Sequence, residues 1–217
     1  MKKGFFIAGT DTEVGKTFSA CALLHAARDQ GFSALAMKPV AAGVEADGEN
    51  EDVRRLMAAA SVAAPRDLIN PFLYAPPVAP HIAAAEAGRP IKAAAIRHAF
   101  QALKPLAEVV LVEGVGGWRV PLGDDFDAAD LAVDLGLPVI LVVGMRLGCI
   151  SHARLSAESI AATGLPLAGW IANRIDPAMG RFDENLKYLQ TCLPAPLLGI
   201  IAHGATVEAA GKSLTLP

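Results

Sequence analysis

The sequence has few cysteines, and they do not form a disulfide framework. Cys21, Cys149 and Cys192 are widely spaced and embedded in apolar segments. An odd and scattered set of this kind favours reduced thiols, so we expect a cytoplasmic protein. There is no Cys-x-x-Cys pair, and the five histidines show no metal-ligand spacing. We therefore expect no zinc site.

An excess of positive charge is also missing. Lysine and arginine total 19 against 22 aspartates and glutamates, which gives a net charge of -3. This balance argues against binding to nucleic acid or to an anionic membrane, and an anionic ligand should be bound locally by one loop. Long apolar runs are absent too, because the polar segment from Gly9 to Lys16 interrupts the N-terminal one. We predict a strand there and not a leader or a membrane span.

Short apolar runs alternate with helix-compatible segments along the whole chain. The pattern predicts one domain over residues 1–217, with no repeats and with a doubly wound, mostly parallel α/β sheet flanked by helices. The predicted strands are Phe5–Ala8, Leu35–Met37, Val109–Val112, Val139–Val143, Leu167–Ala172 and Leu197–Ile201. Two predicted helices, Thr17–Gln30 and His152–Thr163, each stop at a glycine.

Two segments interrupt this alternation. Glu45 to Asp52 is acidic and polar, and we interpret it as a solvated loop that runs into the next helix. Asn70 to His81 contains four prolines, so we predict an irregular connection without helix or strand.

A phosphate-binding loop is the most informative motif. Residues 9–17 read Gly-Thr-Asp-Thr-Glu-Val-Gly-Lys-Thr, between a predicted strand and a predicted helix. Backbone N–H groups of such a loop surround phosphate oxygens, Lys16 reaches the outer phosphates, and Thr17 offers a hydroxyl to Mg²⁺. Gly9 and Gly15 enclose five residues, where the usual loop encloses four. The motif predicts a P-loop fold that uses a nucleoside triphosphate.

Polar residues follow three further predicted strands at the edge where ligands bind in such sheets. Lys38 is either a surface charge or a second cation aimed at the ligand. Glu113 opens a second glycine-rich segment, and with Asp52 it is a candidate partner of Thr17 for Mg²⁺. Asn173 is either an ordinary turn residue or a reader of a base edge.

Taken together, the motifs resemble the dethiobiotin synthetase family over most of the chain. The resemblance rests on the 9–17 loop, Lys-Pro-Val-Ala at 38–41, Pro80-His81, Val-Glu-Gly-Val-Gly-Gly-Trp at 112–118, Leu-Gly-Cys-Ile at 147–150, Ala-Gly-Trp-Ile-Ala-Asn at 168–173 and Pro-Ala-Pro-Leu-Leu-Gly at 194–199. It implies a homodimeric ring-closing ligase that makes a cyclic urea from 7,8-diaminononanoate, CO₂ and ATP with Mg²⁺. The expected intermediates are a carbamate and a carbamic-phosphoric anhydride.

The resemblance also implies roles for particular residues. It favours the ligand-directed interpretation of Lys38, which becomes catalytic together with Lys16 and Thr12, and it assigns Mg²⁺ to Thr17, Asp52 and Glu113. The implied nucleotide contacts are Glu13, Val14, Gly15, Lys16, Thr17, Phe18, Asp52, Glu113, Gly114, Val115, Gly116, Asn173, Arg174, Ala202, His203 and Gly204. The implied substrate contacts are Lys38, Ala42, Gly148, Cys149, Ile150 and Ser151.

Some positions depart from the family pattern. Ala42 stands where a serine is common, Ser151 where an asparagine is common, and Asn185 near an expected tyrosine, so the hold on the substrate carboxylate is left open. The segment Ala202-His203-Gly204 lacks the usual proline, which leaves nucleotide selectivity open.

Three other functions compete with this one. An amide-forming synthetase of the cobyrinic acid diamide type usually carries an additional glutaminase domain, for which this chain is too short. A partitioning ATPase normally has a second lysine where Asp11 stands, and a carboxylate there would repel phosphate. A nucleotide-binding scaffold without turnover stays open, because sequence does not show catalysis.

Overall fold

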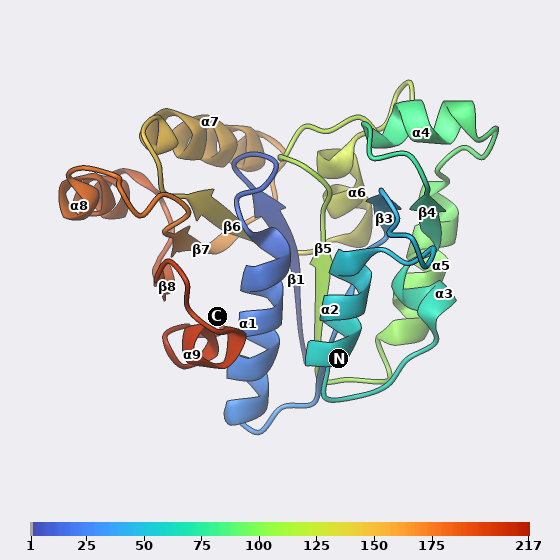
Figure 1. Ribbon diagram of the computed structural model, residues 1–217, viewed down its shortest axis with the longest axis horizontal. Helices are drawn as coiled ribbons and strands as arrows, with labels where there is room; N and C mark the ends of the chain where they lie inside the picture. The colour runs from blue at the N-terminus through green and yellow to red at the C-terminus, as the bar shows by residue number, and fades with distance from the viewer. Residues whose placement is uncertain (1) are drawn as a thin grey trace.

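A six-stranded sheet runs through the centre of the molecule, and every neighbouring pair of its strands is parallel (Figure 1). The structure, a computed structural model, describes residues 2–217. In spatial order the strands are β2 (Ala34–Met37), β5 (Val109–Glu113), β1 (Lys3–Gly9), β6 (Val139–Gly144), β7 (Leu167–Asn173) and β8 (Leu197–Ile201). All six apolar runs predicted as strands are strands, and the α/β class is confirmed.

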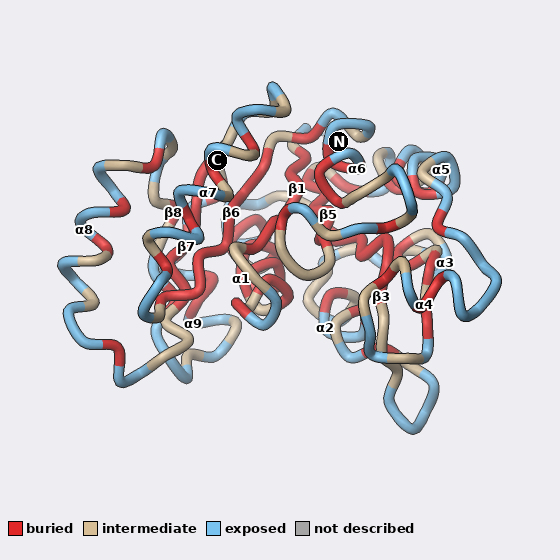
Figure 2. The backbone as a smooth tube through the Cα atoms, turned by 90° about the horizontal axis from the view of Figure 1, so that it is seen from above, coloured by how far each residue is buried: buried red, intermediate tan, exposed pale blue. Residues whose placement is uncertain are grey.

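Helices cover both faces of this sheet. They are α1 (Lys16–Asp29), α2 (Glu51–Ala59), α3 (Arg66–Ile69), α4 (Pro80–Glu86), α5 (Ala93–Leu103), α6 (Ala128–Leu135), α7 (Cys149–Ala162), α8 (Phe182–Cys192) and α9 (Val207–Lys212). Alternate residues of β1 point to opposite sides, so Phe5 and Ile7 pack with α1 and α9, whereas Phe6 and Ala8 pack with α5 to α8. Figure 2 shows the buried strands in the middle and the exposed helix surfaces around them.

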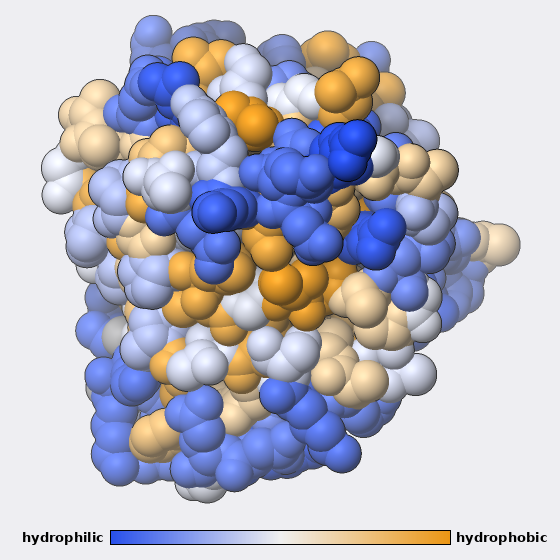
Figure 3. Space-filling model, turned by 90° about the vertical axis from the view of Figure 1, so that its left-hand side faces the viewer, coloured by the Kyte–Doolittle hydropathy of each residue, from blue (hydrophilic) through white to orange (hydrophobic). Residues whose placement is uncertain are grey.

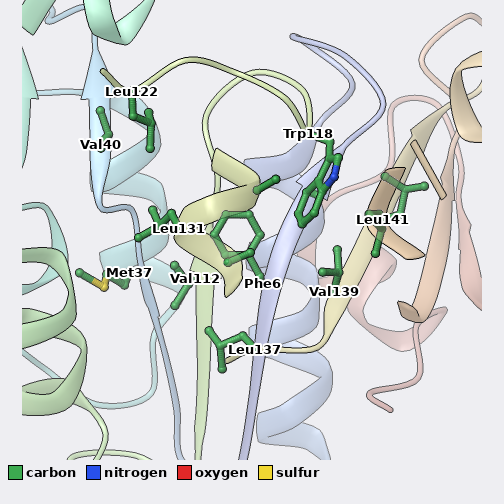
Figure 4. Packing of buried hydrophobic residues seen from close by; sticks show 14 of the residues in the cluster. Phe6, Met37, Val40, Val112, Trp118, Leu122, Leu131, Leu137, Val139 and Leu141 are labelled. Carbon is green, nitrogen blue, oxygen red and sulfur yellow. The ribbon is translucent and has the colours of Figure 1, made fainter. Parts of the chain in front are cut away.

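The core on the α5 to α8 side supports the loop after β5. Trp118 is 4% exposed, and its ring meets that of Phe6 edge to face, with centroids 6.1 Å apart and an interplanar angle of 80°. Val112, Val139 and Leu141 lie close to the two rings in Figure 4. Such an aromatic pair contributes about 0.5–1.5 kcal/mol beyond burial of its area. Trp118 therefore anchors the glycine-rich segment that begins directly after Glu113.

The prediction that Asn70–His81 holds no regular element is wrong. Its first part forms β4 (Phe72–Tyr74), which pairs in parallel with β3 (Val40–Ala42) in a separate two-stranded sheet. Pro80 is the first residue of α4, where a missing N–H removes no bond from within the helix. Similarly, α7 begins at Cys149 and not at His152, because Gly148 adopts φ 95° as its N-terminal flanking residue. Proline and glycine therefore mark the ends of helices and strands in these segments and do not indicate that helices and strands are absent.

The outer edge of β8 is protected by the C-terminal segment. The Thr215 N–H donates to the Leu198 carbonyl at 2.8 Å, and the Ser213 hydroxyl donates to the Ile200 carbonyl at 3.0 Å. Figure 3 shows this side of the molecule, where apolar side chains gather beneath a polar band. Bonds of this kind shield a strand edge from pairing with another chain. Among residues 2–217, no helix combines the length and apolarity needed to cross a membrane.

Candidate functional site

The phosphate loop joins the carboxyl end of β1 to the N-terminus of α1. Gly15 precedes α1 with φ 85°, and a Cβ at that position would lie 2.1 Å from Asn173 Nδ2, so only glycine fits. No side chain caps α1, which leaves N–H groups of its first turn directed at the loop. Lys16 and Thr17 are in that first turn and are 7% and 8% exposed. This geometry is that of an anion site at a helix N-terminus.

Asn173 fastens the loop from β7. Its side-chain nitrogen donates to the Val14 carbonyl at 2.9 Å, and its own carbonyl accepts the Met145 N–H at 2.7 Å. The amide that we expected to read a base edge is therefore partly engaged with the phosphate loop. Asn173 acts first as a brace that fixes the shape of this loop.

A cluster of opposite charges lies next to the loop. The Lys38 ammonium donates to Glu113 Oε1 at 2.6 Å and to Asp52 Oδ2 at 2.7 Å. The Thr17 hydroxyl donates to the same Glu113 oxygen at 2.7 Å. Lys38 is 4% exposed and Glu113 is 1% exposed, so this pair is shielded from water. The sheet edge thus brings together four residues that are far apart in the sequence, and two of them, Lys38 and Glu113, were expected there from their positions after predicted strands.

The two lysines have opposite pKa shifts. Burial lowers the pKa of Lys16 to about 8, and nearby Lys38 adds to that effect although Glu113 opposes it. Burial also disfavours the charge on Lys38, but the Glu113 and Asp52 carboxylates outweigh it and raise its pKa above 10.5. In turn, burial of Asp52 is outweighed by Lys38, which holds the pKa of that carboxyl below 3.8. Lys38 therefore holds its charge more firmly than an ordinary lysine, whereas Lys16 loses its charge around pH 8.

The donor set fits a cation that is shared with a bound phosphate. Glu113 Oε2 is buried without a hydrogen-bond partner, while Glu113 Oε1 accepts the Thr17 hydroxyl and the Lys38 ammonium. The same ammonium also donates to Asp52, so both carboxylates lie in one cluster. Across residues 2–217, no three His, Cys, Asp or Glu side chains gather into a metal site. Mg²⁺ usually takes one or two carboxylates and completes its shell with phosphate and water. The residues present match that requirement and do not match an all-protein cage.

A cavity of about 330 Å³ contains the phosphate loop and the charge cluster. Among its lining residues are Thr12, Glu13, Ala42, Val115 and Gly116. Gly116 has φ 63°, and a Cβ there would meet Val120 at 2.8 Å and the Thr12 hydroxyl at 3.5 Å. The segment after β5 therefore packs closely against Thr12 of the phosphate loop. Most of the residues expected to contact phosphate or carbamate share this one cavity.

The comparisons with known proteins agree with these motifs. The family model described as "AAA domain" matches residues 3–210. ATP-dependent dethiobiotin synthetase BioD of Aromatoleum aromaticum is 63% identical over 220 residues, which cover 99% of this chain and 98% of the relative. The protein of the same name from Nitrosospira multiformis is 51% identical over 216 residues, which cover 100% and 95%. The chain belongs to the dethiobiotin synthetase family.

Solved structures establish the P-loop fold independently. A ParA family ATPase from Chlorobium tepidum aligns with a TM-score of 0.60 at 11% identity, over 98% of this chain and 90% of that one. The septum site-determining protein MinD from Pyrococcus horikoshii, complexed with Mg-ADP, aligns with a TM-score of 0.57 at 14% identity, over 97% and 86%. At these identities the likeness shows the fold of this chain and nothing about its substrate.

The residues expected around the base of the nucleotide form a second cavity. It has a volume of about 320 Å³ and is lined by Phe18, Asn173, Arg174, Ala202, His203 and Gly204, among others. Phe18 also lines the phosphate cavity, so the two cavities adjoin at this ring. The structure thus brings together residues from α1, the end of β7 and the segment after β8. Gly114 lies apart from both cavities, where a Cβ would meet the Phe6 ring at 3.0 Å.

The expected substrate contacts divide into two groups. Lys38 and Ala42 lie in the phosphate cavity. Gly148–Ser151 lie at the N-terminus of α7 and do not line that cavity. Asn185 is on α8, where its side-chain nitrogen donates to the Arg181 carbonyl at 2.7 Å. Within one chain, therefore, the α7 group is separate from the charge cluster.

Sequence reasoning missed two residues of the site. Asn50 lines the phosphate cavity and caps α2, with its Oδ1 accepting the Val53 N–H at 3.2 Å and its Nδ2 donating to the Gly43 carbonyl at 2.8 Å. The helix was expected only after Asp52, whereas it begins at Glu51, so the asparagine directly before it was a missed signal for this cap. Arg146 was also missed, although it follows β6 at the edge of the sheet where the other polar residues were found.

Proposed function

We propose that this protein is an ATP-dependent dethiobiotin synthetase, which closes a cyclic urea from 7,8-diaminononanoate and CO₂. The observation that carries the proposal is the buried Lys38, held between Glu113 and Asp52 within 2.7 Å and facing the phosphate-loop cavity. A fixed cation next to a phosphate site suits a reaction in which a second anion meets the transferred phosphoryl group. The full-length relatives bear the name of the enzyme that this chemistry requires.

The nucleotide contributes the phosphoryl group and occupies the loop between β1 and α1. The N–H groups at the start of α1 bind the phosphate oxygens, and Lys16 reaches the outer ones. Thr17, Glu113 and Asp52 hold Mg²⁺, which when bound neutralises charge that develops on the phosphates. Phe18, Asn173 and the segment 202–204 surround the base and ribose.

The second anion is a carbamate, formed when one amine of the diamine adds to CO₂ and loses a proton. Lys38 and Thr12 hold this carbamate beside the terminal phosphate. One carbamate oxygen attacks the γ-phosphorus, and the bond to ADP breaks, which gives a carbamic-phosphoric anhydride. The neighbouring amine then attacks the carbonyl carbon, loses a proton and expels phosphate, so that the urea ring closes. Lys38 serves as a permanent countercharge because its raised pKa keeps it protonated.

A homodimer explains why the expected substrate residues form two groups. In this proposal the N-terminus of α7, at Gly148–Ser151, binds the substrate carboxylate in the partner subunit's site. The helix end contributes about 0.3–1 kcal/mol to an exposed anion. Cys149 is 2% exposed, so its backbone and not its thiol faces the ligand. We also propose that the enzyme acts in the cytoplasm, since its three cysteines are free.

The test is phosphate release with each component left out in turn. Purified protein would be incubated with ATP, Mg²⁺, bicarbonate and 7,8-diaminononanoate, and phosphate would be measured against time. We expect release only in the complete mixture, because the acceptor oxygen exists only after the carbamate has formed. Equal release without the diamine would contradict the proposal and favour a nucleotide-driven switch.

A further inference from the structure

Arg146 joins two loops that meet at the active edge of the sheet. It follows the buried Met145, whose N–H donates to the Asn173 carbonyl at 2.7 Å. Its own carbonyl accepts the Cys149 N–H at 3.0 Å, which fixes the turn into α7. From this rigid backbone its guanidinium Nη2 reaches Asp11 Oδ2 of the phosphate loop at 2.6 Å.

Asp11 is a costly residue for a loop that binds a polyanion. Its second carboxylate oxygen accepts the Thr12 N–H at 2.8 Å, and its backbone carbonyl accepts a hydrogen bond from Lys16 Nζ at 3.3 Å. The carboxylate thus shapes the loop, yet its negative charge lies close to where phosphates bind and would repel them. Arg146 is the side chain that pairs with this charge.

We propose that Arg146 is a positioning residue, which neutralises Asp11 and thereby lets the loop keep its shape while it accepts a nucleoside triphosphate. The inference rests on the proposed function only in taking the ligand to be a nucleotide. Arg146 acts through Asp11 and needs no contact with the substrate. The effect of Arg146 on nucleotide affinity should therefore depend on the charge of Asp11 and on ionic strength. A residue that only fixed the backbone of the turn would show neither dependence.

The experiment measures the affinity of a non-hydrolysable ATP analogue with Mg²⁺ by calorimetry, beside steady-state turnover. Arg146→Ala should weaken binding about fivefold, the upper end for a pair whose side chains are both 43% exposed. Arg146→Lys should recover most of the loss. Asp11→Asn alone should not weaken binding, and Asp11→Asn with Arg146→Ala should bind within about twofold of the wild type, because no unpaired carboxylate is left.

Arg97→Ala is the matched control. Arg97 of α5 pairs with Asp134 of α6 at 3.1 Å and is 48% exposed, but it lies outside the phosphate cavity. This variant should bind like the wild type. The deficit of Arg146→Ala should also shrink between 50 and 500 mM salt, since the screening length falls from over 10 Å to below 8 Å.

Two results would overturn the inference. One is an Arg146→Ala variant that binds the analogue as well as Arg97→Ala does. The other is a double variant that binds no better than Arg146→Ala, which would show that the Asp11 charge is irrelevant. Failure of the proposed function would look different, because the wild type would then form no urea whatever the affinities of these variants.

Discussion

Removal of the Lys38 charge should lower both the free energy of unfolding and the rate of turnover. Lys38→Met keeps much of the side-chain volume but takes the ammonium away from Glu113 Oε1, 2.6 Å distant, and from Asp52 Oδ2, 2.7 Å distant. Glu113 has a fully buried side chain and one oxygen already without a partner. The substitution therefore leaves an uncompensated charge in the interior, which is one of the few ways a single change causes a large loss of stability.

The size of the loss follows from the burial of the two partners. Removing one member of a buried ion pair costs about 3–5 kcal/mol. The lower end applies here because Asp52 has a 40% exposed side chain and Thr17 still donates to Glu113. A loss of about 3 kcal/mol corresponds to a fall in Tm of about 6–12 °C for a chain of this size. Turnover should fall by about 100-fold or more, with nucleotide affinity nearly unchanged, because the interaction strengthens in the transition state.

Thermal unfolding followed by circular dichroism gives the Tm. Calorimetry gives the nucleotide affinity, and steady-state assays give the turnover. Lys187→Met on the exposed face of α8 is the control for loss of one positive charge. Lys38→Met combined with Glu113→Gln should regain most of the lost Tm but not the turnover, because it removes the unpaired charge and not the need for a cation. If Lys38→Met has the same Tm and the same turnover as the wild type, the buried charge of Lys38 contributes neither to stability nor to catalysis.

Three other predictions concern the nucleotide, the cation and the assembly. Burial lowers the pKa of Lys16 to about 8, so the free protein loses this charge as pH rises, whereas bound phosphate should keep the ammonium protonated. Nucleotide binding at pH 9 should therefore take up most of a proton, and calorimetry in buffers of different ionisation enthalpy would show no difference if Lys16 were not the group. Glu113→Gln should raise the Mg²⁺ concentration needed for half-maximal turnover, and an unchanged titration would remove Glu113 from the metal site. The protein should be a dimer by light scattering at assay concentration, and full activity of a monomer would exclude a shared substrate site.

Much of the fold could be predicted because its strands are buried on both faces. A strand such as β6 is continuously apolar, so it appears in the sequence as a run bounded by polar residues. The positions of Lys38, Glu113 and Asn173 followed from the same rule, since the carboxyl ends of parallel strands meet at one edge. The separate β3–β4 sheet was not predictable in this way, because it consists of three-residue strands among prolines.

The pairing of side chains within the site was not available from the sequence. The spacing of Lys38, Asp52 and Glu113 does not show that one ammonium bridges both carboxylates. This contact depends on how α2, which carries Asp52, packs against the sheet. The hydrogen bond from the Asn173 side chain to the Val14 carbonyl depends likewise on the close approach permitted by Gly15. The partner of Asp11 was missed since Arg146 carries no motif of its own. Sequence thus indicated which residues gather at the edge, and the structure showed which of them touch.

Incorporation of labelled CO₂ tests the proposed reaction most directly. Wild-type protein would be incubated with ¹³C-bicarbonate, ATP, Mg²⁺ and 7,8-diaminononanoate, and the product would be measured by mass spectrometry together with released phosphate. We expect a cyclic urea one mass unit heavier than the unlabelled product, formed together with an equal amount of phosphate, and no urea from Lys38→Met above about one per cent of the wild-type rate. ATP hydrolysis without labelled urea in the wild type would contradict the assignment of this site to urea ring closure.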